Sequence, residues 1–314
     1  MSSLYTQTIQ QEKLPTVSVG ICATTELENA IRLTDFILDL EVSQVKILEV
    51  IVATPNHRLA ASLRGRDPRL VVELETKREG KTSALNKILS RASGDILVLA
   101  SADIRLTRNT VSKLVQGLME NRHWGAVDSR VELVNGDRLL MDRVSTLLWD
   151  VHNATLDELD GNGRLGHVAG DLLAVRRDLV DPIPDVINDD AYLALKIQEN
   201  GFRVKRVRDA LVWIAGPRTP TDYIFQRSRV LRGHLEIIRI FGKMPSTFEF
   251  QILWKPRRYL RLFVHTAARL GPSHLLPTFV AGFLELISFQ LAVVLSITKR
   301  PSRIWRIAET TKRI

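Results

Sequence analysis

The sequence predicts an α/β fold in which a mostly parallel sheet is flanked by helices and followed by a helical C-terminal region. From Pro15 onward, short apolar segments typical of strands alternate with amphipathic segments typical of helices. The segment ILVLA at 96–100 is apolar throughout, as expected for a strand that is buried on both faces. Such strands belong to parallel sheets that are covered by helices on both sides.

Hydrophobic spacing also predicts the individual elements and divides the chain. The expected strands of the N-terminal half span residues 16–23, 46–54, 69–75 and 94–101. The expected helices between them span residues 27–40, 81–92 and 107–121, the last with Thr107 or Asn109 as its N-cap. After about Trp213 the alternation stops, and the chain becomes helical, basic and increasingly apolar. We therefore expect an α/β domain over 15–240 and a helical region over 241–314.

Length, charge and cysteine content limit the classes of protein to consider. A chain of 314 residues can bury a full-sized core. Its formal net charge of +9 attracts polyanions, which include nucleic acid, anionic lipid and phosphate-bearing substrates. Cys22 is the only cysteine, so no disulfide can form within the chain, which fits a reducing compartment. Residues 1–15 lack the features of a secretory signal, and we expect the protein on the cytoplasmic side.

Two segments of the C-terminal region have the composition of membrane-associating helices. Residues 253–271 mix aromatic and leucine side chains with lysine and arginine, as in a helix lying on an anionic membrane surface. Residues 275–297 are long and apolar enough to reach across a hydrocarbon core of about 30 Å. Basic residues flank this second segment at both ends: Arg258, Arg261 and Arg269 before it, and Lys299, Arg300, Arg303 and Arg306 after it.

Polar residues in and around the apolar segment bear on how it meets the membrane. Glu285 and Gln290 lie within it, and a spanning helix normally keeps its positive flank on one side only. We therefore expect a monotopic or re-entrant arrangement at the cytoplasmic face of the cell membrane, in preference to a single span. A buried core helix of a soluble domain is a third interpretation, because such helices are also apolar.

Asp103 is a lone carboxylate at the exit of the most apolar strand. Ligands of open parallel sheets bind beyond the carboxyl ends of the strands. A carboxylate there can hold a divalent cation whose other ligands are diphosphate oxygens. Asp103 could equally cap the helix that is expected near Thr107.

The residues GKT at 80–82 match the end of a P-loop, whose backbone amides surround a phosphate. The first glycine of that pattern would fall at Glu75, where a charge and a Cβ oppose close phosphate approach. A P-loop is therefore not expected. Gly80 and Lys81 at a helix start could still contact an anion.

Two further segments allow a structural and a functional interpretation. Asp189 and Asp190 precede an amphipathic segment, so either acid could be its N-cap or could accept a proton from an attacking hydroxyl. The segment 225–234 predicts a basic helix, which could bind phosphates or form a solvated face.

Taken in order, these motifs resemble a family 2 glycosyltransferase with the GT-A fold. The resemblance covers roughly residues 15–236 and rests on the order and spacing of its motifs. They are Glu26 after the first strand, GKTSALN at 80–86, SAD at 101–103, GHVAGDLLAVRRDL at 166–179, NDDAYLALKIQENGFRV at 188–204, DALVW at 209–213 and QRSRVLRG at 226–233.

The resemblance implies a role for each matching residue. Asp103 would bind Mg²⁺ or Mn²⁺ together with the diphosphate of a nucleotide-sugar donor. Asp190 of the Asp189–Asp190 pair would be the general base of an inverting transfer, and Gly170 and Asp171 would lie in a loop on the acceptor side. The residues implied in donor and cofactor binding are Glu26, Thr54, Lys81, Ser101, Asp103, Gln226 and Arg229.

Several positions depart from the family pattern. Ser101 replaces the first acid of the metal-binding motif, so we expect metal dependence to be partial. Thr54 stands where an acid usually contacts the base, Cys22 and Thr24 replace a proline and an aromatic residue, and Val230 replaces a tryptophan. These departures leave the identity of the donor open.

The function expected is that of a membrane-associated inverting glycosyltransferase with a lipid-linked or membrane-proximal saccharide acceptor. A catalytically inactive GT-A nucleotide-binding module is the alternative, because Ser101 lacks the first acid. A basic nucleic-acid-binding α/β protein is a more remote alternative, since aromatic residues for stacking bases are only 6% of the chain. We therefore expect no nucleic acid among the partners.

Overall fold

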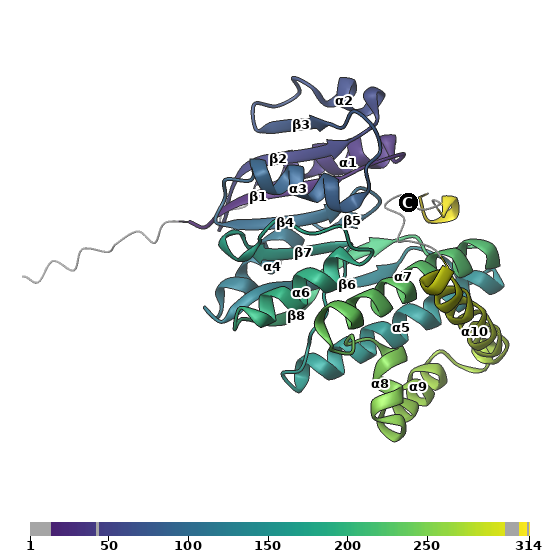
Figure 1. Cartoon of the computed structure of the whole chain (residues 1–314). Coiled ribbons are helices and arrows are strands. Elements are labelled where there is room, and N and C mark those ends of the chain that lie inside the picture. Colours follow the sequence, from purple (N-terminus) through teal and green to yellow (C-terminus); the bar gives the residue numbers. More distant parts are fainter. Residues whose placement is uncertain (1–13, 42–43, 299–307, 313) are drawn as a thin grey trace, which may run out of the picture.

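A single eight-stranded sheet organises the α/β part of the chain (Figure 1). The computed structural model describes residues 14–41, 44–298, 308–312 and 314. The strands are β1 (Thr16–Cys22), β2 (Lys46–Thr54), β3 (Leu70–Leu74), β4 (Ile96–Ser101), β5 (Arg105–Leu106), β6 (Trp124–Leu133), β7 (Leu172–Arg176) and β8 (Arg203–Ile214). Their order in the sheet is β3-β2-β1-β4-β7-β6-β8-β5.

The sheet is mixed, and its parallel part is formed by the N-terminal strands. β3, β2, β1 and β4 pair in parallel, as do β6 and β8. β7 pairs antiparallel with both β4 and β6, and β5 pairs antiparallel with β8. The mostly parallel α/β fold that the sequence predicts is thus confirmed, with β7 inserted in the opposite direction.

Helices cover both faces of the sheet. The α-helices are α1 (Leu27–Leu38), α2 (His57–Leu63), α3 (Lys81–Arg91), α4 (Thr110–Met119), α5 (Leu140–Gly161), α6 (Asp189–Glu199), α7 (Pro220–Phe241), α8 (Phe248–Trp254), α9 (Pro256–Arg269) and α10 (Leu275–Thr298). Apolar side chains of α1, α2 and α4 pack on one face, and those of α3, α6 and the end of α5 pack on the other. The buried ILVLA strand lies between the two layers, as its composition predicts.

One of the two predicted N-caps, Asn109, occupies the N-cap position of α4 but does not cap the helix through its side chain. Its Oδ1 instead accepts a hydrogen bond from Thr107 Oγ1 at 2.6 Å. Asp103 lies seven residues before α4 and is no cap, which leaves its carboxylate available at the edge of the sheet.

A third apolar cluster joins the C-terminal helices to the α/β part. Side chains of α5, α7 and α10 form its buried centre, and residues of α8 and α9 pack around them. α10 contributes a buried stripe at helical spacing, formed by Pro277, Ala281, Leu284, Ser288 and Ala292. α7 ends at Phe241, next to the boundary that the sequence predicts, and the helices after it pack back onto α5 and α7 (Figure 1).

Two expectations concern residues outside the described ranges. The absence of a secretory signal was inferred from residues 1–15, of which only 14 and 15 are described. The basic flank after the apolar segment falls within 299–307, which are likewise not described.

The segment 308–312 lies against the opposite end of the chain. It contains a short 3₁₀ helix, Glu309–Lys312, drawn in yellow in Figure 1 beside the sheet edge that carries β5. Thr310 donates to Asp222 Oδ2 through its backbone N–H at 3.2 Å and its hydroxyl at 2.7 Å. Asn29 of α1 donates its side-chain N–H to the Lys312 carbonyl at 2.8 Å. These bonds hold Lys312 at the carboxyl end of the central strands.

Candidate active site

Glu26, Asp103 and Lys312 form an ion-pair cluster where two neighbouring parallel strands end. β1 and β4 are paired with Cys22 opposite Ser101, so the residues that follow them lie at the same edge of the sheet. Asp103 follows β4, and Glu26 immediately precedes α1. Lys312 Nζ lies 2.8 Å from Asp103 Oδ2 and 2.6 Å from Glu26 Oε1.

Contacts within this cluster favour the charged forms of Glu26 and Lys312. Glu26 Oε2 accepts the backbone N–H groups of Thr24 at 2.8 Å and Thr25 at 2.9 Å. Burial acts to raise the pKa of Glu26, but Lys312 and the Thr24 amide lower that pKa to about 2. Burial acts to lower the pKa of Lys312, and the Asp103 and Glu26 carboxylates more than offset it, so the pKa rises. The ammonium is therefore a permanent cation beside Asp103.

A second cluster joins α3 to the start of α6. Lys81, the first residue of α3, places Nζ 2.9 Å from Asp189 Oδ2. Burial acts to lower the pKa of Lys81, but the charges of Asp189 and Asp190 raise it above its usual value. Asn188 occupies the N-cap position of α6, so Asp189 and Asp190 form the first turn and neither is the cap. Asp190 Oδ1 accepts its neighbour's backbone N–H, from Ala191, at 2.7 Å.

Gly170 allows a loop to pass directly over the Asp190 carboxylate. A Cβ at this position would lie 2.6 Å from Asp190 Oδ2 and 3.2 Å from Lys81 Nζ, closer than real Cβ contacts. The Gly170 carbonyl accepts from Ser101 Oγ at 3.2 Å and from Lys81 Nζ at 3.4 Å. The loop therefore connects the strand end that carries Asp103 with the helix that carries Asp190.

Asp171 and Arg229 complete the electrostatic environment between the two clusters. Burial and the charge of Asp103 raise the pKa of Asp171 to about 6. Burial lowers the pKa of Arg229, whereas the charges of Asp189, Asp190, Asp171 and Asp103 act to raise it. Arg229 on α7 is thus close enough to interact electrostatically with all four carboxylates. It remains a predicted donor-binding residue.

A buried acid beneath this loop was missed by sequence reasoning. Asp128 on β6 is fully buried, and its Oδ1 accepts the Ala169 backbone N–H at 2.6 Å. Burial raises the pKa of Asp128 to about 7, against the opposing charge of Arg206. An acid inside an otherwise buried strand, GAVDSRV at 125–131, was the signal that could have identified it.

Two predicted residues lie apart from these contacts. Thr54 ends β2 and is buried, and its hydroxyl accepts the backbone N–H of Asn56 at 3.1 Å. Gln226 lies half-buried on α7, one residue before Arg227. The sequence predicts a basic helix around Gln226 that binds phosphates or faces solvent. Arg227 of this helix does neither, because it is buried and pairs with Glu249 and Glu285.

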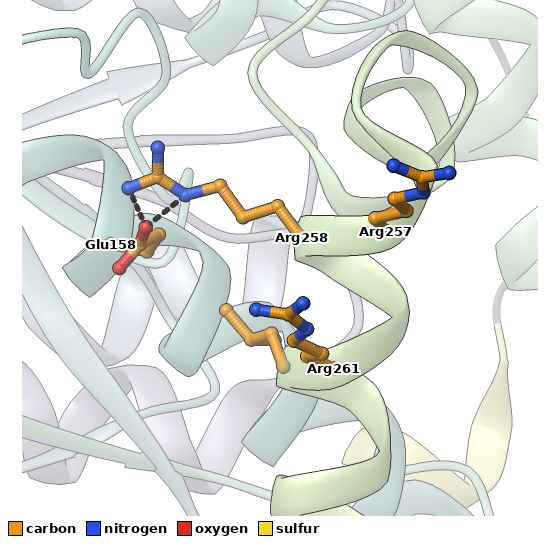
Figure 2. Close-up of a pocket in the computed structure, with 5 residues that line it drawn as sticks. Glu158, Arg257, Arg258 and Arg261 are labelled. Carbon is orange, nitrogen blue, oxygen red and sulfur yellow. Dashed lines mark hydrogen bonds and ion pairs between the residues drawn. The ribbon is translucent and has the colours of Figure 1, made fainter.

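The described residues contain one small cavity beside the acids and one larger recess elsewhere. A cavity of about 10 Å³ is lined by Cys22, Lys81, Gly170, Asp189 and Asp190, among others, and burial raises the pKa of the Cys22 thiol to about 12. The thiol there is unreactive. A recess of about 390 Å³ lies between α5 and α9, where Figure 2 shows Arg258 directed at Glu158 with Arg257 and Arg261 nearby.

The residues at Asp103 fit a divalent cation that is held mainly by a substrate. Among the described residues, no group of three or more His, Cys, Asp or Glu side chains is arranged to hold a metal ion. Ser101 does not supply the negative charge of the missing acid, and its hydroxyl donates to the Gly170 carbonyl. Mg²⁺ commonly binds one or two carboxylates and completes its coordination with phosphate oxygens and water. Asp103 is sufficient for that mode of binding.

Sequence comparison points to one class of protein. The family model described as glycosyl transferase family group 2 matches residues 96–298. A probable glycosyltransferase, YdaM of Bacillus subtilis, is 24% identical over 172 residues, which are 52% of this chain and 40% of that protein. The poly-beta-1,6-N-acetyl-D-glucosamine synthase of Staphylococcus aureus is 23% identical over 193 residues, 58% of this chain and 45% of the synthase. The chain thus spans less than half the length of these relatives.

Solved structures share the fold. The mannosyltransferase PcManGT from Pyrobaculum calidifontis, in complex with GDP-Man and Mn²⁺, superposes with a TM-score of 0.61 and 21% identity. The superposition covers 91% of this chain and 88% of that one. The glucosyl-3-phosphoglycerate synthase from Mycobacterium tuberculosis, in complex with Mn²⁺ and UDP, gives a TM-score of 0.50 with 20% identity over 74% of this chain and 81% of the other. This likeness extends to nearly the whole α/β part and to the C-terminal helices.

Proposed function

Because the chain belongs to glycosyl transferase family group 2, we propose that it catalyses inverting transfer of a sugar from a nucleotide-sugar donor to an acceptor hydroxyl. The observation that carries this proposal is that the loop at Gly170 contacts Ser101, two residues before Asp103, on one side and the Asp190 carboxylate on the other. One carboxylate ends a central strand, where a donor diphosphate would bind. The other begins a helix and faces the same loop.

The proposed reaction is a single displacement. The acceptor oxygen attacks the anomeric carbon while the bond from that carbon to the diphosphate oxygen breaks, and its electron pair leaves with the nucleoside diphosphate. Asp190 takes the proton of the attacking hydroxyl as general base. Because attack comes from the side opposite the leaving group, the configuration at the anomeric carbon inverts.

The neighbours of Asp190 hold it in position. Lys81 pairs with Asp189, the adjacent acid, which fixes the first turn of α6. Gly170 leaves room for the carboxylate under the loop. Asp128 fixes the backbone of that loop through Ala169. These three residues would orient the base without touching the substrate.

Asp103 would hold a divalent cation, Mg²⁺ or Mn²⁺, against the donor diphosphate. When bound, such a cation neutralises the charge that develops on the leaving diphosphate. Glu26, Ser101 and Arg229 border the same space, and Arg229 supplies a fixed guanidinium close to the four acids. Thr54 and Gln226 remain proposed donor contacts, although neither makes a hydrogen bond to the residues of this cluster within the described part of the chain.

We further propose that the acceptor is lipid-linked or membrane-proximal. Within the described residues, Pro272–Thr298 is long and apolar enough to cross a membrane, and 22% of its most apolar window is buried. α10 is therefore not the buried core helix that was one interpretation of the sequence. The face opposite its buried stripe exposes large apolar side chains: Leu275, Leu276, Phe279, Phe283, Leu286, Val294 and Ile297.

The docked stripe and the basic residues of α9 favour an interfacial arrangement. α10 packs on α7, so only one side of it can meet lipid. α9 places Arg257, Arg258 and Arg261 around the recess in Figure 2, and anionic headgroups attract such residues. We propose that this surface, α9 with the exposed face of α10, binds the cytoplasmic face of the cell membrane.

The experiment is a donor screen on the intact chain. UDP-GlcNAc, GDP-Man and UDP-Glc are incubated with membranes or lipid extracts, and release of nucleoside diphosphate is measured together with sugar incorporation. We expect release that requires an acceptor and is lost in Asp190→Asn. Nucleotide binding without acceptor-dependent release for any donor would refute the enzyme and favour the inactive binding module, which the serine at 101 motivates.

A further inference from the structure

Lys312 occupies the position in which the donor diphosphate of the proposed reaction would need a positive charge. Its Nζ contacts Asp103 Oδ2 at 2.8 Å and Glu26 Oε1 at 2.6 Å. Asp103 is the acid to which a divalent cation is assigned above. The ammonium therefore either competes with a metal ion for the Asp103 carboxylate or binds that carboxylate at the same time as the metal ion.

The backbone of the segment that carries Lys312 is held in place from several directions. The Lys312 carbonyl oxygen accepts from Asn29 of α1, and two residues earlier Thr310 makes two hydrogen bonds to Asp222 of α7. Thr310 Oγ1 also accepts the Arg218 backbone N–H at 3.1 Å. An ammonium fixed in this way needs little further ordering when a ligand binds, which favours a binding role.

Charge balance explains why the site needs this cation. Five carboxylates surround the space between the strand ends and α6: Glu26, Asp103, Asp171, Asp189 and Asp190. Among the described residues, three cations face them: Lys81, Arg229 and Lys312. Lys81 is already paired with Asp189. If Lys312 is removed, a diphosphate meets these five acids with only two of the described cations beside them, and like charges at close range oppose binding.

The ammonium also has hydrogen-bonding capacity for a phosphate. It carries three donors. Within the described part of the chain, its recorded side-chain partners are the two carboxylates. The third N–H can be donated to a diphosphate oxygen while both carboxylates stay bound.

We propose that Lys312 is a donor-binding residue that shares Asp103 with the divalent cation and supplies part of the positive charge on the diphosphate, so that nucleoside diphosphates bind even without divalent metal. This inference rests on the proposed function. Ser101 stands where the family has an acid, and the positive charge of Lys312 would compensate for that change. Lys312 lies 209 residues after Asp103 in the chain.

The test is the affinity of the intact chain for UDP and GDP, measured by calorimetry in EDTA and in excess Mg²⁺. The variants are Lys312→Met, Lys312→Arg and Thr310→Val. Lys113→Met is the matched control, because that lysine pairs with Asp209 on the surface, away from the site. Thermal unfolding of each variant is recorded in parallel to confirm that it folds.

A charge-assisted hydrogen bond to phosphate predicts a loss of about 10- to 100-fold in affinity for Lys312→Met in EDTA. We expect the loss to be smaller in Mg²⁺, where the metal ion supplies the charge. Lys312→Arg retains most of the affinity, and Thr310→Val loses a smaller factor because it loosens the segment without removing the charge. Lys113→Met binds as the unmodified chain does.

Three results would overturn the proposal. Binding by the unmodified chain that disappears in EDTA, with Lys312→Met unchanged in Mg²⁺, would assign the charge to metal alone. Tighter binding by Lys312→Met would mean that the lysine blocks the site. If neither UDP nor GDP binds under any condition, while the proteins are folded, the proposed function itself fails together with this inference.

Discussion

Arg227 of α7 and Glu285 of α10 form a bidentate ion pair, with Nε 2.7 Å from Oε1 and Nη2 2.9 Å from Oε2. Tyr223 donates its hydroxyl to the same carboxylate at 2.7 Å, and Glu249 of α8 also contacts Arg227. The acid inside the most apolar segment of the chain is thus directed at protein and not at lipid. It attaches α10 to the helix that carries Arg229.

Loss of the Glu285 carboxylate should destabilise the protein. In Glu285→Gln the buried Arg227 keeps only Glu249 as a charged partner, and breaking a buried ion pair from one side typically costs about 3–5 kcal/mol. With Glu249 present we expect about 3 kcal/mol in the free energy of unfolding, measured by urea denaturation. Gln290→Ala, on the exposed side of α10, is the control and should change this free energy by less than about 0.5 kcal/mol. Equal effects of both substitutions would contradict the structural role of the ion pair.

Substitutions of the two adjacent acids, Asp189 and Asp190, should have different effects on transfer and on stability. Asp190→Asn keeps the shape of the side chain but cannot accept a proton, so single-turnover transfer should fall by about 10²- to 10⁴-fold with nucleotide affinity nearly unchanged. Asp189→Asn should cost less in transfer and more in thermal stability, because it leaves the half-buried Lys81 without its partner at 2.9 Å. Full turnover in Asp190→Asn would show that another group is the base.

Gly170→Ala should misplace the base without unfolding the chain. The new Cβ would lie 2.6 Å from Asp190 Oδ2, and the carboxylate can move away by rotating its side chain. A displacement of about 1 Å in a catalytic group can cost about 10²-fold in rate. We expect kcat to fall by that factor with little change in Tm. Gly136→Ala, where the Cβ meets no atom within 4 Å, should leave both unchanged, and a similar loss of activity there would discount the argument.

The acid stability of the protein should depend on His234. This ring lies buried edge-to-face against His167 and Phe250, at centroid distances of 6.1 and 5.7 Å. Burial lowers its pKa from 6.5 to about 4, with opposing contributions from nearby Glu249. Below pH 6.5 the unfolded chain therefore binds a proton that the folded chain does not, and stability falls until about pH 4.

His234→Phe removes this titration and keeps the ring packing. Relative to the variant, the unmodified protein should lose on the order of 3 kcal/mol of unfolding free energy between pH 7 and pH 4. Taking the difference between the two proteins cancels Asp128 and Asp171, whose raised pKa values change stability in the opposite direction over the same range. If the unfolding free energies of the two proteins change equally with pH, the assignment of this pH dependence to His234 is wrong.

The exposed face of α10 should determine membrane affinity. Phe279 and Phe283 are 77% and 64% exposed, and burial of each phenylalanine in lipid contributes about 2 kcal/mol. Phe279→Ser with Phe283→Ser should weaken sedimentation with anionic vesicles by about a hundredfold or more. Leu139→Ser, an exposed apolar residue just before α5, is the control. Release of the unmodified protein by salt alone would instead indicate attachment through surface charge.

Local sequence pattern determined most of the fold and indicated candidates for the site. Alternating apolar segments specify strands and helices because each must bury one face or both, and this requirement is visible in neighbouring residues. β1, β2, β3, β4, α1, α3 and α4 follow from it within a few residues of their observed bounds. Local pattern made Asp103 and the Asp189–Asp190 pair candidates, because residues after a buried strand and at a helix start lie where ligands bind, and the choice of Asp190 as base rests on the resemblance to family 2 glycosyltransferases.

The tertiary structure alone decided which charges meet. Lys312 contacts Asp103 across 209 residues, and Arg227 contacts Glu285 across 58. A lysine or glutamate gives no periodic signal for a partner so distant, since its pairing depends on how separate helices pack and where the last segment returns. The antiparallel insertion of β7 and the support of Asp128 for the Gly170 loop are of the same kind. Burial excludes water from these groups, so only the folded arrangement of distant elements could provide the opposite charges and hydrogen bonds that they require.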